Sequence, residues 1–362
     1  MDSRAIYAKI EEQLVLQLPF VAYRKANKDV LSAFLQESDT IYTANDYSNS
    51  GFVFAPFDQK KESFLIPADS SRYYNAVLLK DNYNDIAKEP HVNITSDIND
   101  KTKEHHKQLV INGVKSIKTG QFRKVVLSRK EEIKTGKPID LLILFQRLIA
   151  TYPNAFVYLW YHPKIGIWLG ATPETLLSSD GKQFFTMALA GTQLYDPNTE
   201  ANWENKEVEE QEMVTEFILK ELSLISKDIR SSKAYTHRAG TLLHLRTDIN
   251  GDLDLEKPGL QNVLNTLHPT PAVCGLPKQE AKKFILSNEG YDRKFYTGFL
   301  GELNITTGQK TESNLFVNLR CMEVEPEVVN VYVGGGITKD SDPEKEWEET
   351  VRKTETMKKV LF

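Results

Sequence analysis

The sequence has few cysteines and no long apolar run. Among its 362 residues only Cys274 and Cys321 are cysteines, which is too few for a disulfide framework. No run of about 18 apolar residues occurs, so we expect no membrane span. Residues 1–20 are interrupted by charges and predict an amphipathic helix rather than a signal peptide. The cytoplasm is therefore the expected location.

An excess of positive charge is also absent. The formal net charge is −5, whereas contact with phosphates requires a basic patch, so we expect no nucleic acid partner. The sequence contains no HExxH, Walker loop, GxGxxG or CxxC, so metalloprotease, P-loop and dinucleotide-binding functions lack their motifs. A linker rich in Pro, Gly or Ser and a fixed-period repeat are missing as well. We expect one domain over residues 1–362.

The patterns that are present predict many strands and several helices. Apolar periodicity predicts helices at 103–119, 139–152, 203–224, 258–267, 278–287 and from about Ser341 onward. Strands are predicted at 122–129, 155–161, 166–170, 183–189, 233–238, 242–247, 296–304, 313–322 and 328–333. Strands follow strands through short turns more often than through helices. This favours an α+β fold of antiparallel sheets packed with flanking helices.

The segment 333–362 combines a run of glycines with a charged helix. Ser341 followed by Glu344 is a capping-box pattern, so the helix should begin near Ser341. The preceding glycines at 334–336 can direct consecutive backbone N–H groups at one anion. Three residues on this helix share one face: Glu346, Glu349 and Lys353. Both a metal site that holds an anionic substrate and a solvated, charge-rich helix fit this segment.

A second predicted helix offers two carboxylates at the same spacing. Glu207 and Glu210 are three residues apart, as are Glu346 and Glu349. Two helices with a carboxylate pair each could enclose a hard divalent ion. Mg²⁺ suits this arrangement because it accepts a few carboxylates, keeps water and takes other ligands from an anionic substrate. Solvent exposure remains the commoner state of any single glutamate.

Four further residues are candidates for chemistry or binding. Lys124 lies in an apolar strand, where it is either a cleft-facing general base or an edge lysine. Glu174 follows a proline at a strand-to-turn junction, where a carboxyl group could stay protonated and act as a general acid. Arg320 closes an apolar strand and offers a planar fork for a carboxylate. His244, in an apolar run, has the pattern of a core histidine.

Several motifs occur together in the order found in chorismate-utilising enzymes. They are FRKVVLSR (122–129), GATPE (170–174), AGT (190–192), HL (244–245), LHPTPAVCG (267–275), YTG (296–298), RC (320–321) and GGGI (334–337). Over roughly residues 100–360 the chain resembles the isochorismate synthases of this family. The resemblance makes 101–362 the catalytic core of the chorismate-binding domain and 1–100 a family-variable N-terminal part.

The resemblance implies a Mg²⁺-dependent isomerisation of chorismate to isochorismate that feeds menaquinone or siderophore biosynthesis. It implies that Lys124 activates water to attack ring carbon 2 and that Glu174 protonates the hydroxyl leaving carbon 4. The implied metal residues, direct or through water, are Glu210, Glu349, Glu207 and Glu346. The implied substrate-binding residues are Gly191, His244, Ala272, Val273, Tyr296, Arg320, Gly335, Gly336 and Lys353.

Particular residues help to choose among the members that the chain resembles. Aminodeoxychorismate synthases of one type carry a lysine where this chain has Ala190, and anthranilate synthases lack a lysine at the position of Lys124. Salicylate synthases share that lysine but lack the HPTP run, and they remain the alternative. The chain departs from the family at Gln211, where a histidine is usual. We expect a monomer without a glutaminase subunit.

Overall fold

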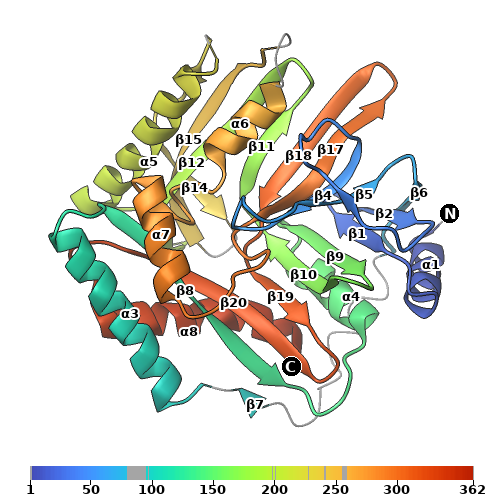
Figure 1. Ribbon diagram of the computed structural model, residues 1–362, viewed down its shortest axis with the longest axis horizontal. Coiled ribbons are helices and arrows are strands. Elements are labelled where there is room, and N and C mark those ends of the chain that lie inside the picture. Colours follow the sequence, from blue (N-terminus) through green and yellow to red (C-terminus); the bar gives the residue numbers. More distant parts are fainter. Residues whose placement is uncertain are drawn as a thin grey trace.

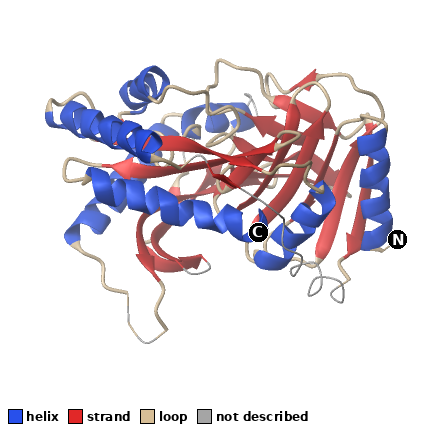
Figure 2. Ribbon diagram, turned by 90° about the horizontal axis from the view of Figure 1, so that it is seen from below, coloured by secondary structure: helices blue, strands red, loops and turns tan. Residues whose placement is uncertain are grey.

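The structure is a computed structural model, and it describes residues 2–79, 95–96, 98–197, 199, 201–226, 228–239, 242–254 and 259–361. Every strand pair within these ranges is antiparallel. The strands form two sheets at the centre of the molecule, and helices cover their outer faces (Figures 1 and 2). The predicted α+β fold is confirmed.

The first sheet, which we call sheet A, takes strands from both ends of the chain. Its strands are β1 (Phe20–Arg24), β2 (Val30–Gln36), β6 (Ser71–Val77), β7 (Thr95–Ser96), β8 (Lys124–Lys134), β9 (Phe156–His162), β10 (Gly166–Thr172), β16 (Gly275–Leu276), β19 (Cys321–Val324) and β20 (Val328–Ile337). Their order is β16-β8-β20-β19-β10-β9-β1-β2-β6, and β7 pairs with β8.

The second sheet, sheet B, is built in the same way. Its strands are β3 (Tyr42–Thr43), β4 (Gly51–Ala55), β5 (Phe64–Pro67), β11 (Thr175–Ser179), β12 (Gln183–Leu194), β13 (Arg230–Ser231), β14 (Tyr235–Ala239), β15 (Leu242–Asp252), β17 (Phe299–Thr307) and β18 (Lys310–Val317). Their order is β13-β15-β12-β11-β18-β17-β4-β5-β3, and β14 pairs with β15.

The helices in the described ranges lie outside the two sheets (Figure 2). They are α1 (Ser3–Val15), α3 (Asp100–Lys118), α4 (Leu141–Thr151), α5 (Asn205–Ser223), α6 (Gly259–Leu267), α7 (Lys278–Asn288) and α8 (Pro343–Leu361). None of these helices is long and apolar enough to cross a membrane. The predicted N-terminal amphipathic helix corresponds to α1. The helix predicted at 258–267 corresponds to α6, although residue 258 lies outside the described ranges.

The core is layered because the central strands bury both of their faces. Along β9, Val157 and Leu159 pack under the helices that cover sheet A, whereas Phe156, Tyr158 and Trp160 point toward sheet B. The layer between the sheets is rich in aromatic rings, and separate apolar clusters lie under α5 and α6 and under α3 and α7. Burial on both faces explains why these strands read as continuous apolar runs.

Two local predictions around the last helix are wrong. The strand predicted at 328–333 does not end before the glycines at 334–336, because β20 continues through them to Ile337 in register with β8. Successive N–H groups in a strand point to opposite edges, so these amides cannot converge on one anion. The cap of α8 is Asp342 rather than Ser341. The Asp342 carboxylate accepts 3.0 Å hydrogen bonds from the N–H groups of Glu344 and Lys345, whereas the Ser341 hydroxyl accepts one from Thr338.

Candidate active site

A cavity of about 420 Å³ lies where the two sheets meet the helices α5 and α8. One edge of β20 is open here, because β19 pairs with β20 only as far as Val331. The residues of β20 beyond that point, from Tyr332 to Gly336, line the cavity. All residues expected to serve the site line this one space: Lys124, Glu174, Gly191, Glu207, Glu210, His244, Ala272, Val273, Tyr296, Arg320, Gly335, Gly336, Glu346, Glu349 and Lys353.

The glycines of β20 let charged side chains approach the strand closely. A Cβ atom on Gly335 would lie 3.3 Å from Oε2 of Glu346 and 3.6 Å from Oε1 of Glu349. A Cβ atom on Gly336 would lie 3.1 Å from Cε of Lys124 and 3.8 Å from Oε1 of Glu210. Carboxylates from α8 therefore lie against β20 at Gly335, and at the next residue, Gly336, a carboxylate from α5 lies beside the amine from β8.

Lys124 is the first residue of β8 and faces the cavity rather than solvent. The residue is only 3% exposed, and its main chain pairs with Leu276 of β16. Its Nζ atom lies 2.5 Å from Oε1 of Glu210. Of the two alternatives for this lysine, the structure therefore has the cleft-facing one. Its role as a general base stays a prediction.

Glu174 lies in the short connection between β10 and β11 and also lines the cavity. Its carbonyl oxygen accepts a hydrogen bond from the N–H of Val317, which ties the connection to β18. Burial raises the pKa of the Glu174 carboxyl to about 7, although the nearby cations Lys124 and Arg320 oppose this rise. The carboxyl group is therefore largely protonated below neutral pH, as a proton donor needs to be.

Two cations and a phenol complete the polar lining. Arg320 lies in the connection from β18 to β19 rather than at a strand end, with a positive φ of 46°. Its guanidinium makes no hydrogen bond with any residue in the described ranges. Lys353 of α8 donates to the carbonyl oxygen of Gly334 at 3.0 Å and pairs with Glu349 at 2.6 Å. Burial raises the pKa of Tyr296, so its hydroxyl keeps its proton. These groups can bind carboxylates.

The residue pattern favoured a core position for His244, whereas the family resemblance placed it at the substrate, and the side chain lines the cavity. Its Nδ1 atom lies 3.0 Å from the carbonyl oxygen of Gly191, so this nitrogen is the donor. Burial lowers the pKa of His244, which keeps the ring neutral. Gly191 itself has a φ of 67°, and a Cβ atom there would lie 3.1 Å from Cβ of Glu207. A larger residue at 191 would therefore push against α5.

The carboxylates fit a hard divalent cation by donor type but are otherwise engaged in this structure. Glu210 pairs with Lys124, and Glu349 pairs with Lys353. Oε2 of Glu207 accepts a hydrogen bond from the N–H of Glu204 and so closes a capping box at the start of α5. Among the described residues no three His, Cys, Asp or Glu side chains are grouped closely enough to hold a metal as they stand. Carboxylate oxygens are nevertheless the donors that Mg²⁺ prefers.

Two residues in or next to the site, His237 and Gln211, have places that the sequence patterns did not predict. His237 of β14 also lines the cavity, because it pairs directly with His244 in the ladder. Only the register between β14 and β15 could have indicated it. Gln211 points away from the cavity, where its amide donates to the hydroxyls of Thr247 at 2.7 Å and Thr215 at 2.8 Å. The residue at which this chain departs from the family pattern, Gln211, therefore helps to attach α5 to β15 and does not line the cavity.

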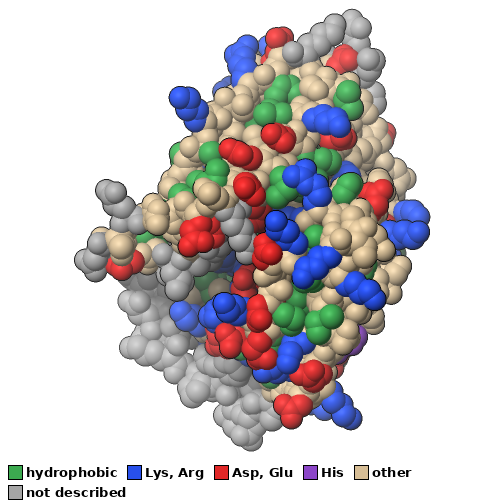
Figure 3. All heavy atoms as spheres, turned by 90° about the vertical axis from the view of Figure 1, so that its left-hand side faces the viewer, with side chains coloured by type: hydrophobic (Ala, Val, Ile, Leu, Met, Phe, Trp, Pro, Cys, Tyr) green, Lys and Arg blue, Asp and Glu red, His purple; other side chains and the backbone are tan. Residues whose placement is uncertain are grey.

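The outer surface on the α5 side carries charges of both signs. Figure 3 shows Asp and Glu side chains close beside Lys and Arg over this face, with only small hydrophobic areas between them.

The chain is similar to known proteins over most of its length. The sequence model described as chorismate binding enzyme matches residues 59–362. Isochorismate synthase EntC from Escherichia coli K12 is 32% identical over 263 residues, which cover 70% of this chain and 66% of that protein. Isochorismate synthase DhbC from Bacillus subtilis is 28% identical over 331 residues, which cover 84% of this chain and 79% of that protein.

A solved structure shows the same fold. MenF, the menaquinone-specific isochorismate synthase from Escherichia coli, superimposes with a TM-score of 0.76 and 23% identity, over 95% of this chain and 89% of that chain. The predicted resemblance to isochorismate synthases is thus confirmed. The chain belongs to the family of chorismate binding enzymes.

Proposed function

We propose that this protein is an isochorismate synthase, which isomerises chorismate to isochorismate in a Mg²⁺-dependent reaction. The observation that carries the proposal is that Lys124 and Glu174 line one cavity. One is an amine, and the other is a carboxyl group that stays protonated up to a pH of about 7. Binding alone needs neither group, whereas moving a hydroxyl between ring carbons requires a base and an acid. The names of the relatives support the same reaction.

The polar lining suits a dianionic substrate. Chorismate carries one carboxylate on its ring and another on its enolpyruvyl group. We assign the enolpyruvyl carboxylate to Arg320, Lys353 and Tyr296, because two cations and a hydroxyl donor face the cavity there. Ala272 and Val273 supply an apolar wall for the ring. The neutral His244 ring closes the cavity on the side of Gly191.

In the proposed reaction a water oxygen bonds to ring carbon 2, the two ring double bonds each shift by one position, from C1–C2 and C5–C6 to C1–C6 and C4–C5, and the bond from carbon 4 to its hydroxyl breaks. The Lys124 amine takes the proton from the attacking water. The Glu174 carboxyl gives its proton to the departing hydroxyl, which leaves as water. One water is added and one is lost, so the net reaction is an isomerisation. The proton then returns from Lys124 to Glu174 through solvent, which restores both groups.

We propose that Glu210 and Glu349 hold the Mg²⁺ ion, with Glu207 and Glu346 in supporting positions. When bound, the ion neutralises and orients the ring carboxylate. The support for these ligands is that α5 and α8 bring the carboxylates to one strand end, where Gly335 and Gly336 leave them room. The product would feed menaquinone or siderophore biosynthesis.

The test is to incubate the purified protein with chorismate and Mg²⁺ and to separate the products by chromatography. We expect isochorismate and no pyruvate, and we expect the reaction to stop when EDTA removes the metal. Unchanged chorismate would overturn the proposal. Salicylate together with pyruvate would favour the alternative, a salicylate synthase of the same family, in which elimination follows isomerisation. A lactate dehydrogenase assay measures the pyruvate independently.

A further inference from the structure

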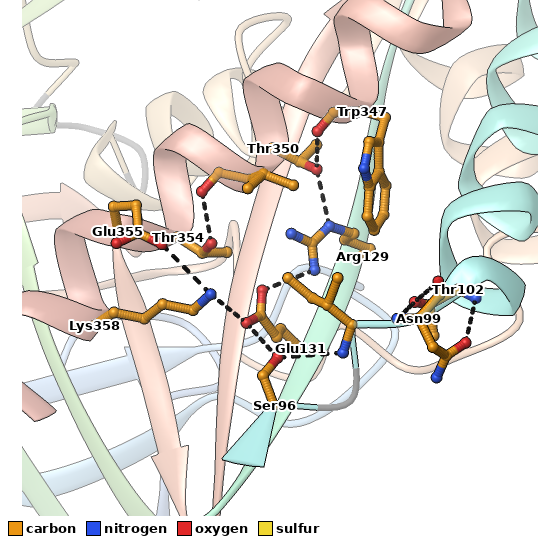
Figure 4. A network of polar contacts seen from close by, with 12 residues as sticks. Ser96, Asn99, Thr102, Arg129, Glu131, Trp347, Thr350, Thr354, Glu355 and Lys358 are labelled. Atoms are coloured by element: carbon orange, nitrogen blue, oxygen red, sulfur yellow. Dashed lines mark hydrogen bonds and ion pairs between the residues drawn. The ribbon is translucent and has the colours of Figure 1, made fainter. Parts of the chain in front are cut away.

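A buried polar network joins β8 to the face of α8 that points away from the cavity (Figure 4). Arg129 and Glu131 of β8 are 8% and 0% exposed. Figure 4 shows Arg129 directed at Trp347 and Thr350 of α8, and Glu131 directed at Lys358 of the same helix. Charged groups are seldom this deeply buried unless they are paired, so the network is a built feature of the fold.

Arg129 contacts α8 in two ways. Its Nε atom donates a 2.8 Å hydrogen bond to the hydroxyl of Thr350. Its guanidinium also lies over the ring of Trp347, 4.7 Å from the ring centre. A planar guanidinium can stack and donate at the same time, which a lysine ammonium cannot do. Through these two contacts Arg129 holds the first turns of α8 against both a shift along the helix axis and a rotation about it.

Glu131 extends the same network to the end of the helix. Its Oε2 atom accepts from Nη1 of Arg129 at 3.1 Å, and its Oε1 atom lies 2.6 Å from Nζ of Lys358. The hydroxyl of Ser96 donates to Oε1 at 2.8 Å. One carboxylate thus bridges two cations, of which one comes from β8 and the other from α8.

The α8 residues that contact Arg129 alternate along the helix with the α8 residues that line the cavity. Trp347 and Thr350 immediately follow Glu346 and Glu349, and all four lie on the same turns of α8. Arg129, which makes these contacts, is on the same strand as Lys124. The position of the α8 carboxylates relative to the Lys124 amine is therefore set through β8 and its contacts.

We propose that Arg129, Glu131 and Lys358 are positioning residues, which hold the carboxylates of α8 in register with Lys124. The inference rests on the proposed function, because it assigns the network to that active site. The link is indirect: none of the three lines the cavity, and each acts through α8. Outer-shell partners of metal ligands typically change metal affinity or activity by about 10–100-fold when they are removed.

The test uses substitutions on α8 that spare the buried charges. Thr350→Val removes the hydroxyl that accepts the hydrogen bond from Arg129, and Thr350→Ser keeps it. The matched control is Thr354→Val, since Thr354 is also buried on α8 and its hydroxyl, like that of Thr350, donates within the helix at 2.8 Å. Circular dichroism melting confirms that each variant is folded at the assay temperature.

We expect Thr350→Val to bind Mg²⁺ about tenfold more weakly by calorimetry and to lose kcat by a similar factor. Amide hydrogen exchange in residues 346–353 should become faster. Thr350→Ser and Thr354→Val should resemble the wild type. Wild-type Mg²⁺ affinity and kcat in folded Thr350→Val would overturn the positioning role, as would an equal loss in Thr354→Val. A wild type that leaves chorismate unchanged would overturn the proposed function, and the exchange comparison would then decide the positioning role alone.

Discussion

Replacing Glu174 by Gln should abolish turnover and at the same time stabilise the fold in alkaline solution. The pKa of this carboxyl group rises from an ordinary 4.5 to about 7 in the folded chain, mainly because of burial. At about 1.4 kcal/mol per pH unit, ionised Glu174 therefore opposes folding by about 3 kcal/mol, less whatever the water in the cavity offsets. Glutamine resembles the protonated carboxyl but has no proton to donate.

The sign follows from proton binding. Between pH 4.5 and about 7 the folded wild type binds more protons than the unfolded chain, so its stability falls as the pH rises through this window. Below pH 4.5 the wild type and the variant should be equally stable, since the carboxyl is protonated in both states. Above about pH 8 the variant should be more stable by about 1–3 kcal/mol.

The assay is urea unfolding of both proteins at about pH 5 and about pH 8.5, together with chorismate turnover at neutral pH. Loss of the acid should lower kcat by about 10²–10⁴-fold, while chorismate still binds. An equal or lower stability of Glu174→Gln at about pH 8.5 would refute the argument that Glu174 is held protonated. Unimpaired turnover would refute its role as the acid.

Three further predictions concern the rest of the cavity. Lys124→Met should lower kcat by about 10²–10⁴-fold with chorismate binding retained in calorimetry, and full activity would remove the assigned base. Gly336→Ala places a Cβ atom 3.1 Å from Cε of Lys124, so we expect kcat to fall about tenfold with little change in KM, whereas unaltered kinetics would mean that the lysine moves freely. Glu349→Gln should weaken Mg²⁺ binding in calorimetry by at least about tenfold, and a wild-type titration would argue against it as a ligand.

The sequence predicts the elements better than it predicts their junctions. The i, i+3 and i+7 spacing correctly places Glu346, Glu349 and Lys353 on one face of α8, because helical periodicity is a local property. The end of β20 was placed too early, since glycines usually end a strand and only pairing with β8 carries it on to Ile337.

Contacts between distant segments lie beyond sequence patterns. Lys124 pairs with Glu210, which is 86 residues further along the chain, and no periodicity links the two. The motifs indicated that both belong to one site only through the resemblance to a family. His237 was missed because its place in the cavity depends on the register between β14 and β15. The Arg129 network is similarly invisible, since arginine and glutamate in a strand usually indicate a solvent-facing edge.

The most direct test of the central claim is the reaction in water enriched in heavy oxygen. In the proposed reaction Lys124 activates a water molecule and Glu174 protonates the departing hydroxyl. Mass spectrometry should therefore find one heavy oxygen in isochorismate, at carbon 2, and chorismate recovered from Lys124→Met should be unlabelled. Isochorismate without the label would contradict the account, because the hydroxyl would then have moved within the substrate rather than come from water.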